Sequence, residues 1–540
     1  MAQRLSPAIL ALILVAAACG STGPSPSPAA ASPSPTATPP IATPAPTLAA
    51  APTPALELAD LAQFHAAMRP EFAADVDGSP DLTRYAIDVA VTFNADGTAT
   101  LAGREHVLYT NQQTVALPDI VFMLWPAAGG QYASRMDLGR VTVDGSEVRP
   151  QMENDGLTAR IALPAPLAPG ARAELSAEFT VKAFPWTGGS GIKRFGITGR
   201  VLLAPTFYPL IPRLVDGLWQ TLPAPPGGDT TNSDSALYVW RVTAPADQVI
   251  VGSGSVVSAT TTGQTQTQTI VTGPMRDLAL AVGPLRLTSR TADGVTLNAY
   301  LLPEHADKAS AILDVAAGQL RTLEALVGPY PFAELDLVGA GLCGGVCGIE
   351  YPGEVFINVG SAMPPLPGEE GFGPSDQEEL FQLLDITVHE VGHQWFYGLI
   401  GDDQLLQPWV DEAATSYTEV LYAEKTSGAA AARDVLRKFQ DQLRASSDRE
   451  LPVGLGIADY PSELEYGVIV YDKGALFFDA LRRQLGDPTF FAFLHAYYER
   501  YRYGFASARG FQATAETACA CDLSALFDLW VYKGGAVPAN

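Results

Sequence analysis

The residues best suited to chemistry lie in one short segment, TVHEVGHQWF, at positions 387–396. His389 and His393 are four residues apart, so on a helix their side chains lie about 40° apart on one face. Two imidazoles in that arrangement can bind one zinc ion. Glu390 follows His389 directly, where its carboxylate can act as general base on a zinc-bound water without being a ligand. The spacing therefore predicts a zinc-dependent hydrolytic site on a helix over 380–398.

Zinc that activates water needs a third protein ligand and one open position. Glu412 is the candidate, because it lies in WVDEAATSYTE (409–419), beyond a loop and near the start of a predicted helix over 410–424. Glu419 follows two turns later and lies on the same side of the helix. It is either a hydrogen-bond acceptor for a ligand histidine or an ordinary surface acid. The alternative for the whole pattern is a helix with structural histidines, which a carboxylate at this distance disfavours.

The two segments together resemble the zinc-binding residues of the M1 aminopeptidases, which are gluzincins. The family pattern is HExxH, eighteen residues and then Glu, and the interval from His393 to Glu412 matches it. The sequence PWVDE is closest to a bacterial secreted branch. The resemblance implies a β-rich N-terminal domain of saddle or sandwich form, followed by a thermolysin-like α+β zinc peptidase domain. It also implies one zinc ion as cofactor and peptides as substrates.

A second part of the resemblance is the segment GIEYPG at 348–353. Glycine-rich backbone followed by a single acid predicts an edge strand along which a peptide can lie. The M1 family carries GxMEN here, and its Glu binds the free α-amine of the substrate. Glu350 matches that Glu and Gly348 its neighbour, whereas the surrounding positions depart from the family pattern and give GxEYPG. The alternative for Glu350 is a solvated acid in a turn.

The segment VYDKGA at 470–475 resembles the YEKG segment of the family, whose Tyr points into the active site. Tyr471 matches that Tyr. A phenol there can donate a hydrogen bond to the oxyanion of a tetrahedral intermediate. Without the resemblance, Tyr471 is interpreted as a half-buried aromatic residue of the core.

The first residues have the pattern of an export signal. Residues 1–18 combine a basic start with an apolar run too short to span a bilayer, as in a signal peptide. Small residues precede Cys19, which resembles a bacterial lipobox, whose cysteine receives a lipid. Residues 19–58 are rich in Pro, Ser, Ala and Thr and predict an extended, disordered tether. We therefore expect an extracytoplasmic protein that is lipid-anchored to the bacterial cell membrane, or secreted if Cys19 is not lipidated.

The remaining sequence predicts two folded domains. The region 59–290 is expected to start with a short helix over 56–68. Beyond this helix, apolar and polar positions alternate between turns, which predicts strands and hairpins. Residues 291–540 combine strands with helices and end soon after Trp530, which leaves no room for the helical-repeat C-terminal domain of many relatives. The net charge of −25 argues against a nucleic-acid partner. Nothing in the sequence decides the oligomeric state.

Four cysteines remain after Cys19 is set aside for lipid: Cys343, Cys347, Cys519 and Cys521. An even number in an exported protein predicts disulfides. Three pairings are possible, two of them joining the distant clusters and one joining each cysteine to its near neighbour. A second zinc site made of thiolates is the weaker interpretation.

These patterns predict a zinc aminopeptidase in which Glu390 activates water, Tyr471 supports the oxyanion and Glu350 holds the substrate amine. A zinc endopeptidase of thermolysin style shares the metal site and lacks the amine-binding Glu. A non-catalytic envelope binding protein on the same fold is the third hypothesis, and it predicts a broken zinc or base position, which the sequence does not show.

Overall fold

The computed structural model of the protein describes residues 56–187, 192–223, 227–229, 232–343, 347–359 and 376–537. The expected signal peptide, Cys19 and nearly all of the expected tether lie outside the described residues. Within the described ranges, every helix is too short or too polar to span a bilayer.

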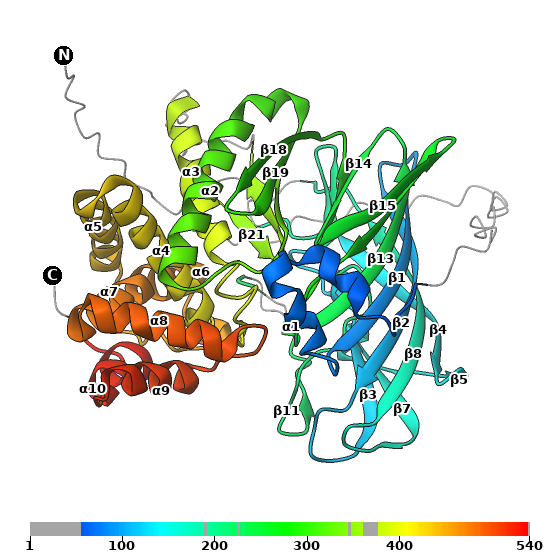
Figure 1. The fold of residues 1–540 in the computed structure, drawn as a ribbon, viewed down its shortest axis with the longest axis horizontal. Coiled ribbons are helices and arrows are strands. Elements are labelled where there is room, and N and C mark those ends of the chain that lie inside the picture. The colour runs from blue at the N-terminus through cyan, green and yellow to red at the C-terminus, as the bar shows by residue number, and fades with distance from the viewer. Residues whose placement is uncertain are drawn as a thin grey trace, which may run out of the picture. The chain divides into compact units, whose positions relative to one another are not determined.

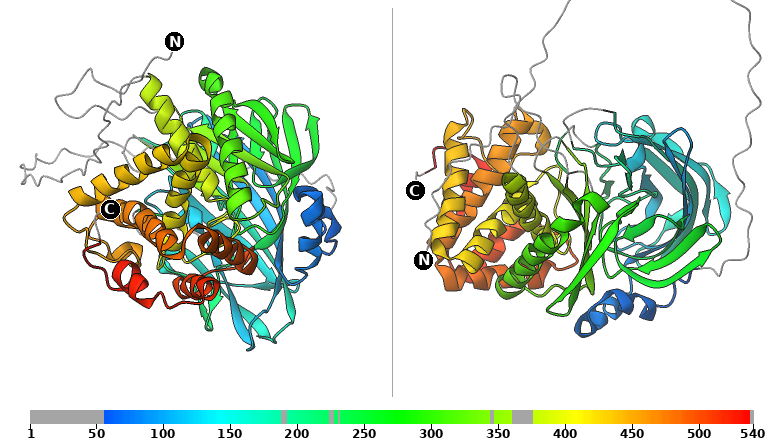
Figure 2. Two further views of the ribbon diagram at one scale, coloured as in Figure 1. Left: turned by 60° about the vertical axis from the view of Figure 1, so that its left-hand side comes forward. Right: turned by 90° about the horizontal axis from the view of Figure 1, so that it is seen from above.

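The N-terminal half of the described chain is built around an eight-stranded sheet with the order β15-β16-β13-β1-β2-β8-β4-β5. Its strands are β1 (Thr83–Phe93), β2 (Ala99–Thr110), β4 (Ser134–Val143), β5 (Ser146–Val148), β8 (Arg172–Ala183), β13 (Ala236–Pro245), β15 (Ser255–Thr262) and β16 (Thr265–Val271). Neighbours are antiparallel except β1 and β13. Side chains of β8 alternate between buried and exposed, as a sheet with one face on a core requires. The strands curve into an open arc in the right-hand view of Figure 2.

Smaller sheets complete this half of the protein. A three-stranded sheet has the order β3-β7-β6, a four-stranded sheet the order β14-β17-β10-β9, and β11 pairs with β12. Their bounds are β3 Leu117–Met123, β6 Gln151–Glu153, β7 Thr158–Leu167, β9 Gly196–Thr198, β10 Val201–Leu203, β11 Leu214–Val215, β12 Leu218–Trp219, β14 Val249–Gly252 and β17 Leu280–Gly283. The expectation of a β-rich first domain is therefore confirmed at the level of its strands.

One buried acid in this sheet makes a testable contribution to stability. Glu105 lies on β2 with no exposed surface, and neither of its carboxyl oxygens has a hydrogen-bond partner among the described residues. Burial raises the pKa of Glu105 well above its ordinary value of 4.5. The unfolded chain therefore releases this proton near pH 4.5 while the folded protein keeps it, so the free energy of unfolding falls as pH rises above that value.

We expect Glu105→Gln to remove this pH dependence while keeping the side-chain volume. The stability of the variant relative to the wild type should therefore increase from pH 5 to pH 8, by at most about 1.4 kcal/mol per pH unit, measured by denaturant unfolding. Glu174→Gln, at an exposed position on the adjacent strand β8, is the control and should show no such gain. A Glu105→Gln variant whose stability tracks the wild type across this range would contradict a buried, neutral carboxyl.

The segment before β1 differs from the single helix expected over 56–68. It forms two short 3₁₀ turns, η1 (Ala62–Ala67) and η2 (Pro70–Phe72), followed by α1 (Ala73–Asp77). Met68 is extended and forms a bridge to Phe332, so the backbone there pairs with another part of the chain. Pro70 lacks an N–H group and favours an extended residue before it, which stops a continuous helix.

The C-terminal half begins with a five-stranded mixed sheet of order β18-β19-β20-β22-β21. Its strands are β18 (Arg286–Ala292), β19 (Val295–Leu301), β20 (Glu334–Ala340), β21 (Gly348–Tyr351) and β22 (Glu354–Asn358). The first strand of this sheet begins at Arg286, slightly before the domain boundary expected at 290. β21 pairs only with β22 and lies at the edge of the sheet, as the sequence predicts.

Helices cover this sheet and complete the molecule (Figure 1). They are η5 (Pro303–Lys308), α2 (Ala309–Leu326), α3 (Asp376–Gly392), α4 (Trp409–Ser427), α5 (Ala429–Ala445), η6 (Ile457–Asp459), α6 (Glu463–Tyr466), the π-helical turn η7 (Gly467–Lys473), α7 (Gly474–Leu485), α8 (Asp487–Tyr501), α9 (Ala508–Cys519), α10 (Ser524–Phe527) and the π-helical turn η8 (Asp528–Tyr532). α2 and α3 pack on the sheet, and α3 packs on α4. The two helices with the zinc-binding pattern are therefore neighbours.

The cysteines pair locally. Disulfides join Cys343 to Cys347 and Cys519 to Cys521. Of the three pairings allowed by the sequence, the structure has the one that leaves the two distant clusters unlinked. The first disulfide lies just before β21, the strand that carries Glu350.

Candidate metal centre

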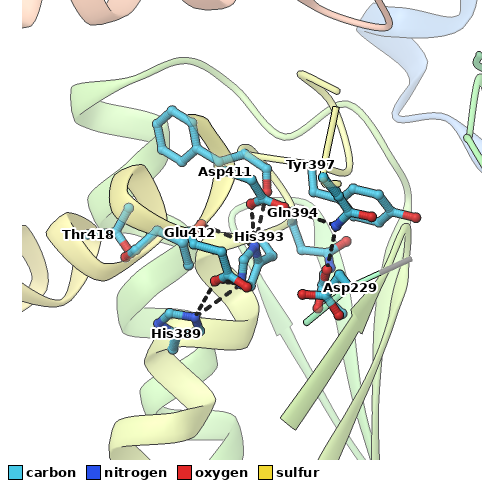
Figure 3. A network of polar contacts seen from close by, with 12 residues as sticks. Asp229, His389, His393, Gln394, Tyr397, Asp411, Glu412 and Thr418 are labelled. Atoms are coloured by element: carbon cyan, nitrogen blue, oxygen red, sulfur yellow. Dashed lines mark hydrogen bonds and ion pairs between the residues drawn. The ribbon is translucent and has the colours of Figure 1, made fainter. Parts of the chain in front are cut away.

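Three predicted ligands converge between α3 and α4 (Figure 3). His389 Nε2 lies 3.1 Å from His393 Nε2, and Glu412 Oε2 lies 3.4 Å from the first and 3.3 Å from the second. Four ligands in a tetrahedron with bonds of about 2.0–2.1 Å lie about 3.3–3.4 Å from one another. The triangle of donor atoms therefore has the size that one zinc ion requires.

The chemistry of the three donors also fits zinc. All three side chains are buried, and Glu412 Oε2 has no hydrogen-bond partner among the described residues. A buried carboxylate oxygen without a partner is costly unless a cation or a donor satisfies it. Two imidazoles and one carboxylate form a ligand set typical of catalytic zinc.

A glycine allows the two helices to come close enough to form this triangle. A Cβ on Gly392 would overlap the Thr418 side chain of α4. α3 ends at this glycine, whereas the sequence predicts a helix continuing to 398. After Gly392 the backbone hydrogen bonds join residues three apart instead of four, from Gln394 N to Val391 O and from Trp395 N to Gly392 O. The chain then turns at Tyr397, whose φ is 91°. The turn brings the chain from α3 toward the loop that leads to α4.

Two acids orient the ligand histidines. Glu419 Oε1 lies 2.9 Å from His389 Nδ1, which is one of the two roles that the sequence left open for it, and Asp411 Oδ1 lies 2.6 Å from His393 Nδ1. An acceptor on Nδ1 leaves the Nε2 lone pair available for a metal. The spacing of the zinc-binding pattern does not point to Asp411. Its position directly before Glu412, on the helix that supplies the third ligand, is the signal that could have identified it.

Glu390 lies beside the triangle and contacts the edge strand. Its side chain is buried, and Oε2 has no hydrogen-bond partner among the described residues. A Cβ on Gly348 would overlap this carboxylate, so the glycine leaves the space that Glu390 occupies. Burial raises the pKa of Glu390 to about 7, and His393 and His389 oppose the rise. A dication nearby would lower this pKa further and favour the form that accepts a proton.

Glu350 lies on β21 and is buried, so it is not a solvated turn acid. Burial, followed by the charge of Asp229, raises the pKa of Glu350 well above its ordinary value. Gln394 connects this strand to the metal segment, because its Nε2 donates to Tyr351 O at 3.0 Å and its Oε1 accepts from Gly353 N at 2.8 Å. The residue after the second zinc-binding histidine therefore holds the edge strand in place.

Tyr471 is part of the same cluster. It lies in the π-helical turn η7, its hydroxyl donates to Glu412 Oε1, and its ring stacks on that of His389 with 5.8 Å between centroids. π-Helical turns occur frequently at functional sites. Tyr471 is half-buried and packs against the helical core, and the same side chain lies next to two of the predicted zinc ligands.

Comparison with known proteins agrees with this geometry. Residues 370–530 match the peptidase family M1 domain. Relatives of the M1 domain include the aminopeptidase N of Lactococcus lactis subsp. lactis, 26% identical over 35% of this chain and 24% of the relative, and that of Lactobacillus delbrueckii subsp. lactis, 24% identical over 49% of this chain and 31% of the relative. The chain thus spans about a quarter to a third of the length of these relatives.

Solved structures extend the likeness beyond the M1 domain. An M1 zinc metallopeptidase from Deinococcus radiodurans has a TM-score of 0.61 at 19% identity, with 85% of this chain and 95% of that one covered. A mutant of that peptidase bound to a Tyr-Ser-Ala substrate has the same TM-score at 20% identity, with the same coverage. The expected fold, a β-rich region followed by an M1 domain, is therefore confirmed.

The β-rich half contributes residues to this site that do not follow from the motifs. Arg194 is buried; it forms an ion pair with Asp229 and donates to Tyr351 Oη at 3.2 Å. Burial raises the pKa of Asp229 to about 6, against the lowering effect of Arg194, and Glu412 contributes to the rise. No spacing rule connects these positions, because they come from loops far from 389–412 in the sequence. They meet only when the two halves fold together.

Proposed function

We propose that the protein is a zinc-dependent aminopeptidase that removes N-terminal residues from peptides. The observation that carries the proposal is the buried triangle formed by His389, His393 and Glu412, with Glu390 beside it. The match to the M1 domain and the aminopeptidases among its relatives support the same activity.

The three donor atoms of the triangle would hold one zinc ion. Zinc bound there polarises a carbonyl group and lowers the pKa of water, so that a strong nucleophile exists at neutral pH. Glu419 and Asp411 keep the two imidazoles in the tautomer that binds metal. The protein therefore supplies the ligands, their orientation and a site largely shielded from solvent.

Glu390 is the general base in this proposal. Its carboxylate takes a proton from the attacking water and passes that proton to the amine that leaves. Because Gly348 has no side chain, the Glu390 carboxylate lies against β21, and a substrate bound along that strand would present its peptide bond there. Because Glu390 ligates nothing, its charge is free to change during the reaction.

Tyr471 stabilises the negative charge that develops on the carbonyl oxygen. In the structure its hydroxyl donates to Glu412 Oε1, so it already lies at the metal site. A phenol that shifts from a ligand oxygen to a developing oxyanion contributes most in the transition state, when the charge appears.

Glu350 holds the substrate's free amine. The site is rich in carboxylates, since Glu350, Glu390, Asp411 and Glu412 are buried around it and Asp229 is half-buried beside them. A buried cluster of acids favours cations, and an α-ammonium group is the cation that every free N-terminus carries.

Glu350→Gln tests the aminopeptidase restriction. We expect kcat/KM on peptides with a free amine to fall about tenfold to hundredfold, the cost of losing a hydrogen bond to a charged group. N-acetylated peptides should be cleaved far more slowly than free ones by the wild type, and the variant should narrow that difference. Equal wild-type rates on both substrates would favour the endopeptidase hypothesis, and no cleavage by a zinc-loaded wild type would favour the binding-protein hypothesis.

We also propose that Cys19 carries a lipid and that the protein acts outside the cytoplasm, on the membrane surface. The small residues before Cys19 and the tether of residues 19–58 support this location. Cys19→Ser expressed in a bacterial host should move the protein from the membrane fraction to the soluble fraction. Membrane association equal to that of the wild type would contradict lipid anchoring at this residue.

A further inference from the structure

Gln404 lies between two carboxylates with different tasks. It occupies the loop between α3 and α4 and is 3% exposed. Its Nε2 donates to Glu350 Oε1 at 3.0 Å and to Asp411 Oδ2 at 3.1 Å. One amide nitrogen therefore serves both the acid proposed to bind the substrate amine and the acid that orients a zinc ligand.

The chemistry of the three groups explains why an amide stands there. An NH₂ group has two hydrogens and can satisfy two acceptors at once. Its own carbonyl oxygen would be repelled by either carboxylate, which fixes the orientation of the amide. A buried carboxylate without a donor is costly, and a cationic donor would neutralise the charge that Glu350 needs for an ammonium ion. A neutral donor gives both acids a hydrogen-bond partner without adding a positive charge that would compete with the substrate ammonium.

The contact extends a chain of groups from the amine site to the metal site. Asp411 uses Oδ2 for Gln404 and Oδ1 for His393 Nδ1, at 3.1 and 2.6 Å. Both oxygens of this carboxylate therefore have a fixed partner. A rotation of the carboxylate at one end would break its contact at the other.

The loop around Gln404 is held by backbone contacts on both sides. Arg276 donates to Tyr397 O at 2.7 Å, and a Cβ on Gly401 would overlap its guanidinium, so this arginine packs directly on the loop. On the other side, Ile457 N donates to Leu405 O at 3.0 Å. Gln404 therefore has a firmly anchored backbone from which its side chain reaches both acids.

We propose that Gln404 is a positioning residue that joins the amine-binding carboxylate to the carboxylate that orients His393. This proposal rests on the proposed aminopeptidase function. It predicts that one substitution weakens two properties together: recognition of a free N-terminus, through Glu350, and zinc retention, through Asp411 and His393.

The test compares Gln404→Met, which keeps the length and removes the donors, with Gln404→Asn, which keeps the amide on a shorter side chain. Gln407→Met is the matched control, because Gln407 lies in the same loop and its Oε1 accepts from Ala508 N, away from the metal site. Each zinc-loaded variant is assayed for kcat and KM on a fluorogenic peptide with a free or an acetylated N-terminus. Zinc affinity is measured by competition with a chelator.

For Gln404→Met we expect KM for the free peptide to rise about tenfold or more and zinc affinity to fall about tenfold to hundredfold. The preference for free over acetylated peptide should shrink. Gln407→Met should match the wild type in KM, in zinc affinity and in this preference. A folded Gln404→Met with wild-type KM, preference and zinc affinity would overturn the proposal. If that variant does not fold, Gln404→Asn decides by the same criteria. A zinc-loaded wild type without aminopeptidase activity would instead reject the proposed function.

Discussion

Replacing Glu390 with glutamine is expected to lower kcat about 10²–10⁴-fold, the usual contribution of a general base, without removing zinc. The physical reason is that Gln keeps the volume of the side chain in the space beside Gly348 and cannot accept a proton from water. Because Glu390 lies outside the triangle of ligands, zinc content should stay at one ion per chain. Steady-state kinetics and metal analysis on the same preparation measure both effects.

The control for this variant is Glu379→Gln, on the same helix α3 and away from the metal cluster. It should retain the kinetics and the zinc content of the wild type. A Glu390→Gln enzyme with full zinc and wild-type kcat would remove this residue from the mechanism. Loss of zinc from the variant would also count against its role, because it would make Glu390 a ligand.

Glu412→Gln is expected to have the largest effect on the metal. An amide is a much weaker zinc ligand than a carboxylate, and the two imidazoles alone leave the ion with too few protein ligands. Zinc affinity should fall at least about 1,000-fold, more than the 10- to 100-fold typical of residues that only orient a ligand. Competition with a chelator of known affinity measures the change, and activity should follow zinc occupancy.

Two variants on the same helix α4 bracket this effect. Glu419→Gln, which removes the acceptor of His389 Nδ1, should lower zinc affinity about 10- to 100-fold. Glu424→Gln, which contacts Arg482 and not the metal cluster, should leave the affinity unchanged. If Glu412→Gln bound zinc as tightly as Glu424→Gln, the third ligand would have to be another residue.

The central part of the site was predictable from the sequence because helix geometry connects spacing to position. His389, His393 and Glu390 follow from a four-residue interval on one helix, and Glu419 follows from a two-turn interval after Glu412 on the next. The resemblance to the M1 family supplied Glu350 and Tyr471. Each of these residues lies in a short motif that can be recognised from neighbouring positions in the sequence.

The contacts between segments could not be predicted in the same way. Gln404 lies in a loop without periodicity, and its role depends on the distance to Glu350, which comes from a different strand. Arg194 and Asp229 reach the site from the β-rich half, and no interval in the sequence encodes that approach. Packing between distant segments brings such residues together, and spacing along one sequence does not reveal which segments will meet.

The ends of helices are also only partly predictable from the sequence. The helix α5 begins after Gly428 and ends before Ser446, and the stretch between these two residues is amphipathic. The helix with the metal ligands ends at Gly392 although apolar residues continue, because the following aromatic residues are buried in a turn. Near the C-terminal end, α9 covers Ala508–Cys519, and the stretch over 524–532 divides into a short helix and a π-helical turn.

The most direct test of a zinc site between these helices is anomalous X-ray diffraction from crystals of the protein, with data collected on both sides of the zinc absorption edge. We expect one anomalous peak, about 2.0–2.2 Å from His389 Nε2, His393 Nε2 and a carboxylate oxygen of Glu412. A peak at the zinc edge elsewhere in the molecule, or a metal held without Glu412, would contradict the assignment on which the proposed activity depends.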